Sequence, residues 1–193
     1  MPILEAEARM YPDNLLGKVG TDDVREAGTN NGDRNWWALM TRTRQEKAVA
    51  RYLLAREVPF YLPLIWKDHF VRGRRIRSHL PLFTNYLFLY GTPEERVTAL
   101  QSNRLIQTLP VTEQAELLSD LQNIEQLIVA DAPLTVESRL QPGRHVRIKA
   151  GVMRGVEGCI TKRRSKTRVL VAVHFLQSGV SVEIDDYLLE PID

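Results

Sequence analysis

The segment at residues 82–90 constrains the fold of this chain more than any other. From Tyr86 to Tyr90 every side chain in it is bulky and apolar or aromatic. A strand with apolar side chains on both faces belongs in the middle of a sheet that other elements cover on both sides. The segment therefore predicts a central strand, and with it a domain in which helices pack against a sheet.

The residues on either side of this strand supply the other elements of a mixed α+β domain. Apolar periodicity, helix-forming residues and breakers at Pro59, Pro63 and Gly73 place these elements along the chain. We expect strands at residues 36–41, 60–66 and 105–111, a β-hairpin at 70–79, and helices at 44–58, 92–103 and 112–129. Thr92 and Glu95 have the spacing of a capping box at the start of the second helix.

Composition divides the chain into four segments. Residues 1–34 hold few large apolar side chains and predict a disordered N-terminal tail with one short helix. Residues 35–130 form the α+β domain, whose mixed sheet we expect to be mainly antiparallel, and residues 131–141 predict a linker. Residues 142–193 alternate strand-length runs with glycine turns and predict a small five-stranded all-β barrel.

Few residues suit catalysis or metal binding. Cys159 is the only cysteine, so neither an internal disulfide nor a thiolate metal cluster can form. The four histidines lack the spacing of a metal site, and the chain has no phosphate-binding glycine loop. These patterns predict a protein that is not an enzyme and binds neither metal nor cofactor. The alternative, an enzyme of unfamiliar type, predicts a cofactor that copurifies in stoichiometric amount.

The N-terminal residues and the hydropathy of the chain indicate where in the cell the protein lies. The first residues are acidic where a secretion signal needs basic ones, and no apolar run reaches the ~18 residues of a membrane helix. We therefore expect a cytoplasmic protein, a monomer, with no membrane partner.

Basic residues gather in particular regions. Residues 35–79 carry 10 basic and 3 acidic side chains, whereas residues 80–139 carry 3 basic and 8 acidic. Within the predicted hairpin, the arginines are Arg72, Arg74, Arg75 and Arg77. Charge also protects an exposed sheet edge, but four guanidinium groups with no acid among them favour phosphate binding. The basic run at residues 162–168 fits a nucleic-acid contact and a solvated turn equally well.

Several motifs, in the same order, resemble the N-terminal domain of NusG-type transcription elongation factors. They are Trp36-Trp37, Phe60-Tyr-Leu-Pro63, Val71-Arg-Gly-Arg-Arg75 and Pro81-Leu-Phe-Thr-Asn-Tyr-Leu-Phe88. Farther along, a segment similar to the KOW motif of the same family holds Gly143, Gly151, Gly155 and Gly158. Together the two similar regions span about residues 35–191.

Within the family, the basic hairpin and the strand beginning Asn85-Tyr86 are most similar to the specialised RfaH-like antitermination paralogues. The chain departs from them in three ways. Thr84 stands where proline is usual, and Val97-Thr98-Ala99 stand in place of a His-Thr-Thr element. The C-terminal region has strand-like patterns throughout, so we expect no switch to a helical fold.

The resemblance implies a transcription elongation and antitermination regulator that suppresses pausing. Its N-terminal domain would bind the clamp helices of the largest RNA polymerase subunit through Phe60, Tyr61, Phe83, Tyr86 and Phe88. From the residues alone, such aromatic side chains are core by default. Upstream or non-template DNA would lie near Arg72, Arg74, Arg75, Arg77 and Arg104.

The resemblance also implies a role for the C-terminal domain. It would recruit a small-subunit ribosomal protein or the Rho helicase, with Met153 and Phe175 as candidate contacts. The alternative is a ribosome-associated or RNA-binding KOW protein, whose affinity would depend on the basic hairpins and fall steeply with salt.

Overall fold

The computed structural model describes residues 7–19, 34–137, 143–163, 166–185 and 188–192. The chain forms two compact units, Met1–Gln114 and Ala115–Asp193. The first is mixed α+β and the second holds an all-β sheet, which confirms the predicted fold class.

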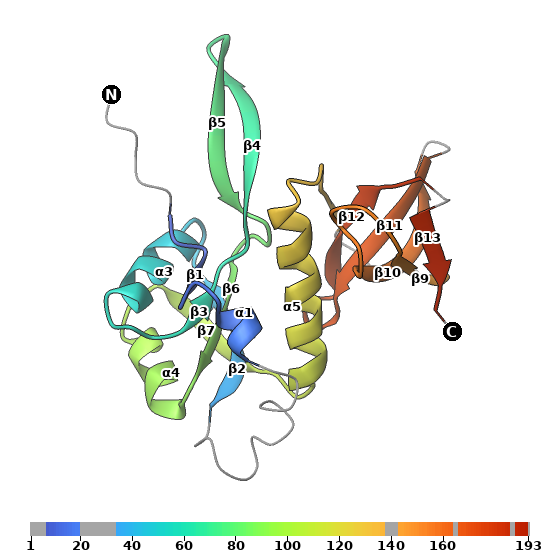
Figure 1. Cartoon of the computed structure of the whole chain (residues 1–193). Coiled ribbons are helices and arrows are strands. Elements are labelled where there is room, and N and C mark those ends of the chain that lie inside the picture. Colours follow the sequence, from blue (N-terminus) through green and yellow to red (C-terminus); the bar gives the residue numbers. More distant parts are fainter. Residues whose placement is uncertain (1–6, 20–33, 138–142, 164–165, 186–187, 193) are drawn as a thin grey trace. The chain divides into compact units, whose positions relative to one another are not determined.

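A five-stranded antiparallel sheet forms the centre of the first unit (Figure 1). Its strands, in spatial order, are β1 (Met10–Tyr11), β3 (Phe60–Tyr61), β6 (Tyr86–Gly91), β2 (Asn35–Thr41) and β7 (Leu105–Pro110). Strand β6 lies in the middle, as its apolar sequence predicts. It begins at Tyr86 and not at residue 82, because Asn85 has a left-handed backbone (φ 68°) that no strand residue adopts.

Two helices cover one face of this sheet, α3 (Glu46–Leu54) and α4 (Pro93–Leu100). Leu39, Leu87 and Leu89 of the sheet form a buried core with side chains from both helices. The predicted capping box at the start of α4 is confirmed. The Glu95 amide donates to the Thr92 hydroxyl, and the Thr92 amide donates to the Glu95 carboxylate.

The other face of the sheet carries a second set of large side chains. Cross-strand partners share a face, so Trp36 lies beside Tyr90, and Ala38 beside Phe88. All four are buried, and the Trp36 and Tyr90 rings lie 5.2 Å apart. The central strands are thus apolar on both faces, as expected.

Part of the predicted disordered tail is ordered. Strand β1 pairs with β3, and the short helix α1 (Leu15–Lys18) follows it. Met10, Leu15, Leu16 and Val19 are buried. The short helix agrees with the sequence prediction. The predicted disorder is wrong for residues 7–19, because a few well-spaced apolar side chains suffice when a sheet edge is available for pairing. Residues 1–6 and 20–33 lie outside the described part of the chain.

A long β-hairpin extends from the first unit as a separate two-stranded ribbon (Figure 1). Its strands are β4 (Leu64–Val71) and β5 (Arg74–Pro81). Arg72 and Gly73 both have positive φ angles, as a type I′ turn requires. The hairpin is confirmed, but it is longer than residues 70–79. The strand expected at 60–66 breaks around Pro63 into β3 and β4.

The second unit contains helix α5 (Gln114–Val129) and a six-stranded sheet. The first residue of α5, Gln114, is the last residue of the first unit. The sheet strands, in spatial order, are β13 (Leu189–Pro191), β9 (His145–Ile148), β10 (Glu157–Arg163), β11 (Lys166–Val173), β12 (Ser178–Glu183) and β8 (Thr135–Glu137). A short 3₁₀ helix, η1 (His174–Leu176), joins β11 to β12. In the part of the chain that the structure describes, five strands follow residue 142, as predicted. The sixth, β8, lies in the expected linker and pairs with β12.

Candidate nucleic-acid interface

The hairpin arginines do not form one cluster. Trp66, Asp68 and Phe70 of β4 lie opposite His79, Arg77 and Arg75 of β5, and these six residues share one face of the ribbon. We call this face the aromatic face. Arg74 belongs to the opposite face, and Arg72 lies in the turn. The structure therefore brings Arg75 and Arg77 together and separates Arg74 from them.

Two large aromatic side chains on this ribbon are exposed. Trp66 is 50% exposed and Phe70 is 76% exposed. The Trp66 indole stacks on the His79 ring at 4.4 Å and 15°, and the Arg77 guanidinium lies 5.3 Å from the indole centroid. Neither residue was predicted from the sequence to form a contact. The signal that could have found them is the two-residue periodicity of β4, in which apolar Trp66 and Phe70 fall on the same face as charged Asp68.

Charges on the aromatic face are partly paired. The Arg75 guanidinium donates to the Asp68 carboxylate. This hydrogen bond, and then the attraction between the two charges, raises the pKa of Arg75. The pair is exposed, so its contribution to stability is small.

A groove of about 890 Å³ lies at the base of the hairpin, between β4, β5, α3 and the segment before β1. Its lining includes Lys47 and Arg51 from α3, Trp66 and His79 from the hairpin, and Glu7. Glu7 forms a 2.6 Å ion pair with Arg51. Burial, and then the nearby Lys47 and Arg9 charges, lower the pKa of His79. The charged side chains of the groove are thus mainly basic, and Trp66 and His79 supply its rings.

Arg104 lies elsewhere in the first unit. Its guanidinium donates to the Gln45 side chain at 2.6 Å, and its carbonyl accepts from the Arg42 amide. Gln45 is the N-cap of α3. Arg104 and Arg42 therefore lie at the end of the sheet where α3 begins, and not on the hairpin.

The predicted polymerase-binding aromatics are mostly buried. Phe60, Tyr61 and Phe88 are 0% exposed, and Phe83 is 4% exposed. Tyr86 is half-buried and lies opposite half-buried Met40 on β2. Of this set, Tyr86 alone offers partial access in the structure. Thr84, where the family pattern has proline, is exposed in the turn before β6.

The turn that precedes β6 is held from two sides. The buried Glu46 carboxylate of α3 accepts the Asn85 amide at 2.7 Å, and the Asn85 carbonyl accepts the Thr41 amide at 2.8 Å. These contacts fix the entry of the chain into the central strand, directly before Tyr86.

The four predicted KOW-motif glycines occupy constrained positions in the second unit. Gly151 and Gly155 have positive φ angles in the turn after β9. A Cβ atom on Gly143 or Gly158 would collide with a backbone carbonyl of β10 or β11. Met153 lies in the same turn as Gly151, and Phe175 lies in η1; both are half-buried.

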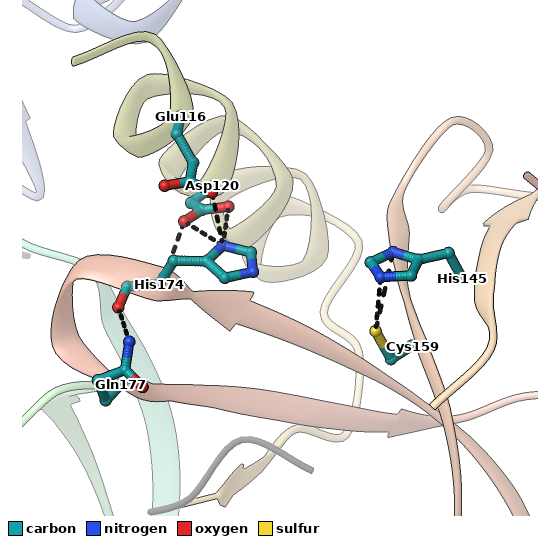
Figure 2. Close-up of polar contacts among 6 residues, drawn as sticks. All are labelled: Glu116, Asp120, His145, Cys159, His174 and Gln177. Atoms are coloured by element: carbon teal, nitrogen blue, oxygen red, sulfur yellow. Dashed lines mark hydrogen bonds and ion pairs between the residues drawn. The ribbon is translucent and has the colours of Figure 1, made fainter. Parts of the chain in front are cut away.

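Two clusters of polar side chains in the second unit contain the residue types that catalytic sites use (Figure 2). Asp120 of α5 accepts the His174 amide at 2.9 Å and lies 3.1 Å from its Nδ1 atom. Burial raises the pKa of Asp120, and its contacts with His174 oppose this effect. Cys159 lies 3.6 Å from the Nε2 atom of His145.

Neither cluster has the features of a catalytic centre. Burial raises the pKa of the Cys159 thiol, so the nucleophilic thiolate is disfavoured. Asp120 and His174 join α5 to η1, and the Gln177 side chain closes η1 by donating to the His174 carbonyl. Across the described ranges, no three His, Cys, Asp or Glu side chains gather as a metal site would need. No helix in those ranges is long and apolar enough to cross a membrane.

The first unit is an α+β domain with an exposed basic and aromatic ribbon, and the second unit contains an all-β sheet. The family model described as transcription termination factor nusG matches residues 34–137, slightly more than half of the chain. The chain therefore belongs to the NusG family of transcription factors, which are not enzymes. A solved structure concerning domain interaction in Thermotoga maritima NusG aligns with 83% of this chain and 98% of that chain. The identity is 17% and the TM-score 0.42.

Proposed function

We propose that this protein is an elongation and antitermination regulator that binds RNA polymerase and suppresses pausing, as a specialised RfaH-like paralogue. The family match over residues 34–137 carries the proposal. Such a factor needs no chemistry. A domain that binds one state of the polymerase clamp more tightly than another shifts the clamp population by its differential affinity.

The proposed docking surface on the clamp helices of the largest subunit centres on Tyr86. Its partial exposure, together with that of Met40 beside it, supports a direct contact. The other predicted aromatic residues would contribute indirectly, because their buried rings support the sheet on which Tyr86 lies. They are Phe60, Tyr61, Phe83 and Phe88. The Glu46–Asn85 hydrogen bond would hold Tyr86 in place.

The basic residues would face nucleic acid held by the polymerase. Arg72, Arg74, Arg75 and Arg77 on the hairpin are all exposed, which supports a contact with upstream or non-template DNA. Arg104 would form a separate contact beside Arg42, at the start of α3.

The second unit would act as a KOW domain that recruits a partner, either a small-subunit ribosomal protein or Rho. The constrained glycines support the KOW assignment, since Gly151 and Gly155 have the left-handed backbone that this turn requires. Met153 and Phe175 would contribute to the partner surface. The protein would work as a monomer in the cytoplasm, where transcription takes place.

Binding of the Tyr86→Ala variant to an isolated clamp-helix fragment tests the proposal. We expect affinity at least roughly tenfold below that of the native chain, since a central aromatic contact is commonly worth ~2 kcal/mol or more. Tyr86→Phe, which keeps the ring, is the matched control. Phe88→Ala is unsuitable, because truncating a fully buried Phe costs ~3–5 kcal/mol of stability. Native-like affinity of a folded Tyr86→Ala protein would refute the docking surface.

The exposed basic hairpin also favours a second candidate, a ribosome-associated or RNA-binding KOW protein. The two candidates differ in what they bind. The regulator retains polymerase when Arg72 and Arg74 are both replaced by alanine, whereas the RNA-binding protein loses its main ligand. Capture of polymerase and of ribosomal RNA by the same pair of proteins separates them.

A further inference from the structure

Strand β8 (Thr135–Glu137) forms one edge of the sheet in the described part of the second unit. Its three residues pair with Gly179, Val180 and Ser181 of β12. Strand β12 runs over six residues, Ser178–Glu183, so β8 pairs with only half of it. The backbone of a sheet edge can pair with an extended segment of another chain. The question is therefore what kind of segment the β12 edge fits.

The side chain of Arg168 on β11 supplies a polar anchor at this edge. It is only 12% exposed. Its guanidinium donates to the Ser181 hydroxyl at 2.9 Å, to the Ser181 carbonyl at 2.8 Å and to the Thr135 hydroxyl at 2.8 Å. The buried Ser181 hydroxyl in turn donates to the Glu137 carboxylate at 2.7 Å. Thr135 and Glu137 are thus bound by groups that β11 and β12 hold in position.

The two faces of the edge accept different side chains. Cross-strand partners share a face, so Thr135 and Glu137 lie on the polar face with Ser181. Val136 lies on the other face, beside buried Val180. The edge therefore fits an extended segment that carries a hydroxyl, an apolar side chain and a carboxylate at successive positions. The positive charge of the guanidinium favours an acidic segment.

Strand β8 is attached by few contacts. Val136 is 49% exposed, so β8 buries little apolar surface at this position. Its polar contacts would be replaced by contacts with water on release, so their net contribution is small. Arg168 and Ser181 belong to longer strands and remain when β8 leaves. A segment that pairs with all six residues of β12 forms more backbone hydrogen bonds than β8 does, and can displace it.

We propose that the β12 edge is a strand-addition site for an extended, acidic segment of a partner protein, and that β8 occupies this site in the free chain. The partner segment carries the same order of hydroxyl, apolar and carboxylate side chains as Thr135–Glu137. The inference goes beyond the proposed function, because it assigns a partner site to residues other than Met153 and Phe175. It requires neither polymerase nor nucleic acid.

The test is binding of a fluorescein-labelled peptide with the sequence of residues 132–137 to the full chain, followed by anisotropy. In the native chain β8 competes at an effective concentration on the order of mM, so the peptide should bind poorly. The double variant Thr135→Ala, Glu137→Ala loses the side-chain contacts of its own β8. We expect it to bind the peptide at least roughly tenfold more tightly than the native chain does. A peptide with alanine at both matching positions should bind this variant at least roughly tenfold more weakly.

Glu183→Ala is the matched control. It removes a carboxylate that lies 4.0 Å from the Arg168 guanidinium but belongs to β12 and not to β8. This variant should bind the peptide as poorly as the native chain. Hydrogen exchange reports the edge directly. The β12 amides that point towards β8 should exchange faster in the double variant than in the native chain, and slow again when the peptide is added.

Each contrary result has a distinct meaning. Fast exchange in the double variant without peptide binding would overturn the proposal, because an open edge would then accept no strand. Native exchange rates in the double variant would show that the side chains of Thr135 and Glu137 do not hold β8, and would overturn it too. Dimers of the double variant that increase with concentration, without peptide binding, would assign the edge to a second copy of the chain. None of these results bears on Tyr86, so docking to the clamp helices is decided separately.

Discussion

At the scale of single residues, Asn85 controls how the chain enters the central strand. Its φ of 68° is in the left-handed region. Gly tolerates this region because it has no Cβ, and Asn tolerates it better than most residues because its short polar side chain can hydrogen-bond locally. Its backbone amide donates to the Glu46 carboxylate, and its backbone carbonyl accepts from the Thr41 amide. The backbone conformation is therefore fixed by partners on two different elements, and the side chain at 85 must accept it.

Replacing Asn85 tests this constraint. We expect Asn85→Ala to lower the free energy of unfolding by about 1 kcal/mol, and Asn85→Gly to change it little, because glycine has no Cβ to oppose a positive φ. All three tryptophans lie in the first unit, so tryptophan fluorescence in a guanidinium titration reports this unit alone. Equal stability of the two variants would show that backbone strain at 85 is unimportant.

His79 makes the stability of the first unit depend on pH. Burial and the Lys47 and Arg9 charges lower its pKa in the folded chain, with Glu7 acting in the opposite direction. The unfolded chain therefore binds this proton at a higher pH than the folded chain does. The contribution of His79 to stability is present above the ordinary histidine pKa of ~6.5 and is lost as the pH falls through the lowered folded value.

Comparing the native chain with His79→Phe measures this effect. The phenyl ring keeps a partner for Trp66 but cannot bind a proton. Between pH 7.5 and pH 5.5 we expect the guanidinium midpoint, read by tryptophan fluorescence, to fall further for the native chain than for the variant. The opposite order would mean that acid stabilises the pair, as it would if His79 gained a carboxylate partner on protonation.

At the scale of elements, the N-terminal segment is a structural part of the first unit. Strand β1 extends the sheet, and Leu15 and Leu16 of α1 are buried. The family match begins only at residue 34, so this addition lies outside the part that the chain shares with the family model.

Deleting residues 1–19 should therefore destabilise the first unit. Loss of several buried apolar side chains, each worth ~1.5 kcal/mol or more, should lower the denaturation midpoint markedly. Deletion of residues 1–6 removes none of the described packing and should leave the midpoint near its native value. Equal midpoints for the two truncated chains would show that β1 and α1 add nothing to stability.

The elements that could be predicted from sequence are those determined by residues close together in the chain. The central strand, the capping box at Thr92 and the turn at Gly73 each depend on residues near one another in the chain. Strands β1 and β8 were missed because each is short and exists by pairing with a distant strand. Local composition cannot reveal such a partner.

The site was only partly predictable for a related reason. The arginines of the hairpin were found from their density, but their division between two faces depends on the register set by Arg72 and Gly73. The same register brings exposed Trp66 opposite His79. Similarly, nothing in the strand sequence distinguishes half-buried Tyr86 from buried Phe88, since that depends on what covers each position of the sheet.

At the scale of the whole molecule, charge is distributed unevenly along the chain. The segment that includes the hairpin and α3 is strongly basic, and the segment after it is acidic. Interactions with DNA phosphates release counterions, so affinity falls with salt in proportion to the number of contacts. The basic segment should set that dependence for the entire protein.

Replacing the four hairpin arginines, Arg72, Arg74, Arg75 and Arg77, with alanine tests this expectation. The slope of log affinity for DNA against log salt should fall by about 3, since each of the four proposed phosphate contacts contributes about 0.7 to 0.9. Circular dichroism serves as the control that the variant is folded. An unchanged slope would assign the phosphate contacts to other basic residues, such as Arg144 and Lys149 of the second unit.

Strand β1 has one more consequence for the molecule. By pairing with β3, it occupies a sheet edge whose backbone amides and carbonyls would otherwise be open to a strand from another chain. A protein that begins after residue 19 would present Phe60 and Tyr61 at a free edge. We expect such a chain to self-associate during expression and purification, so the first residues protect the protein from aggregation as well as stabilising its fold.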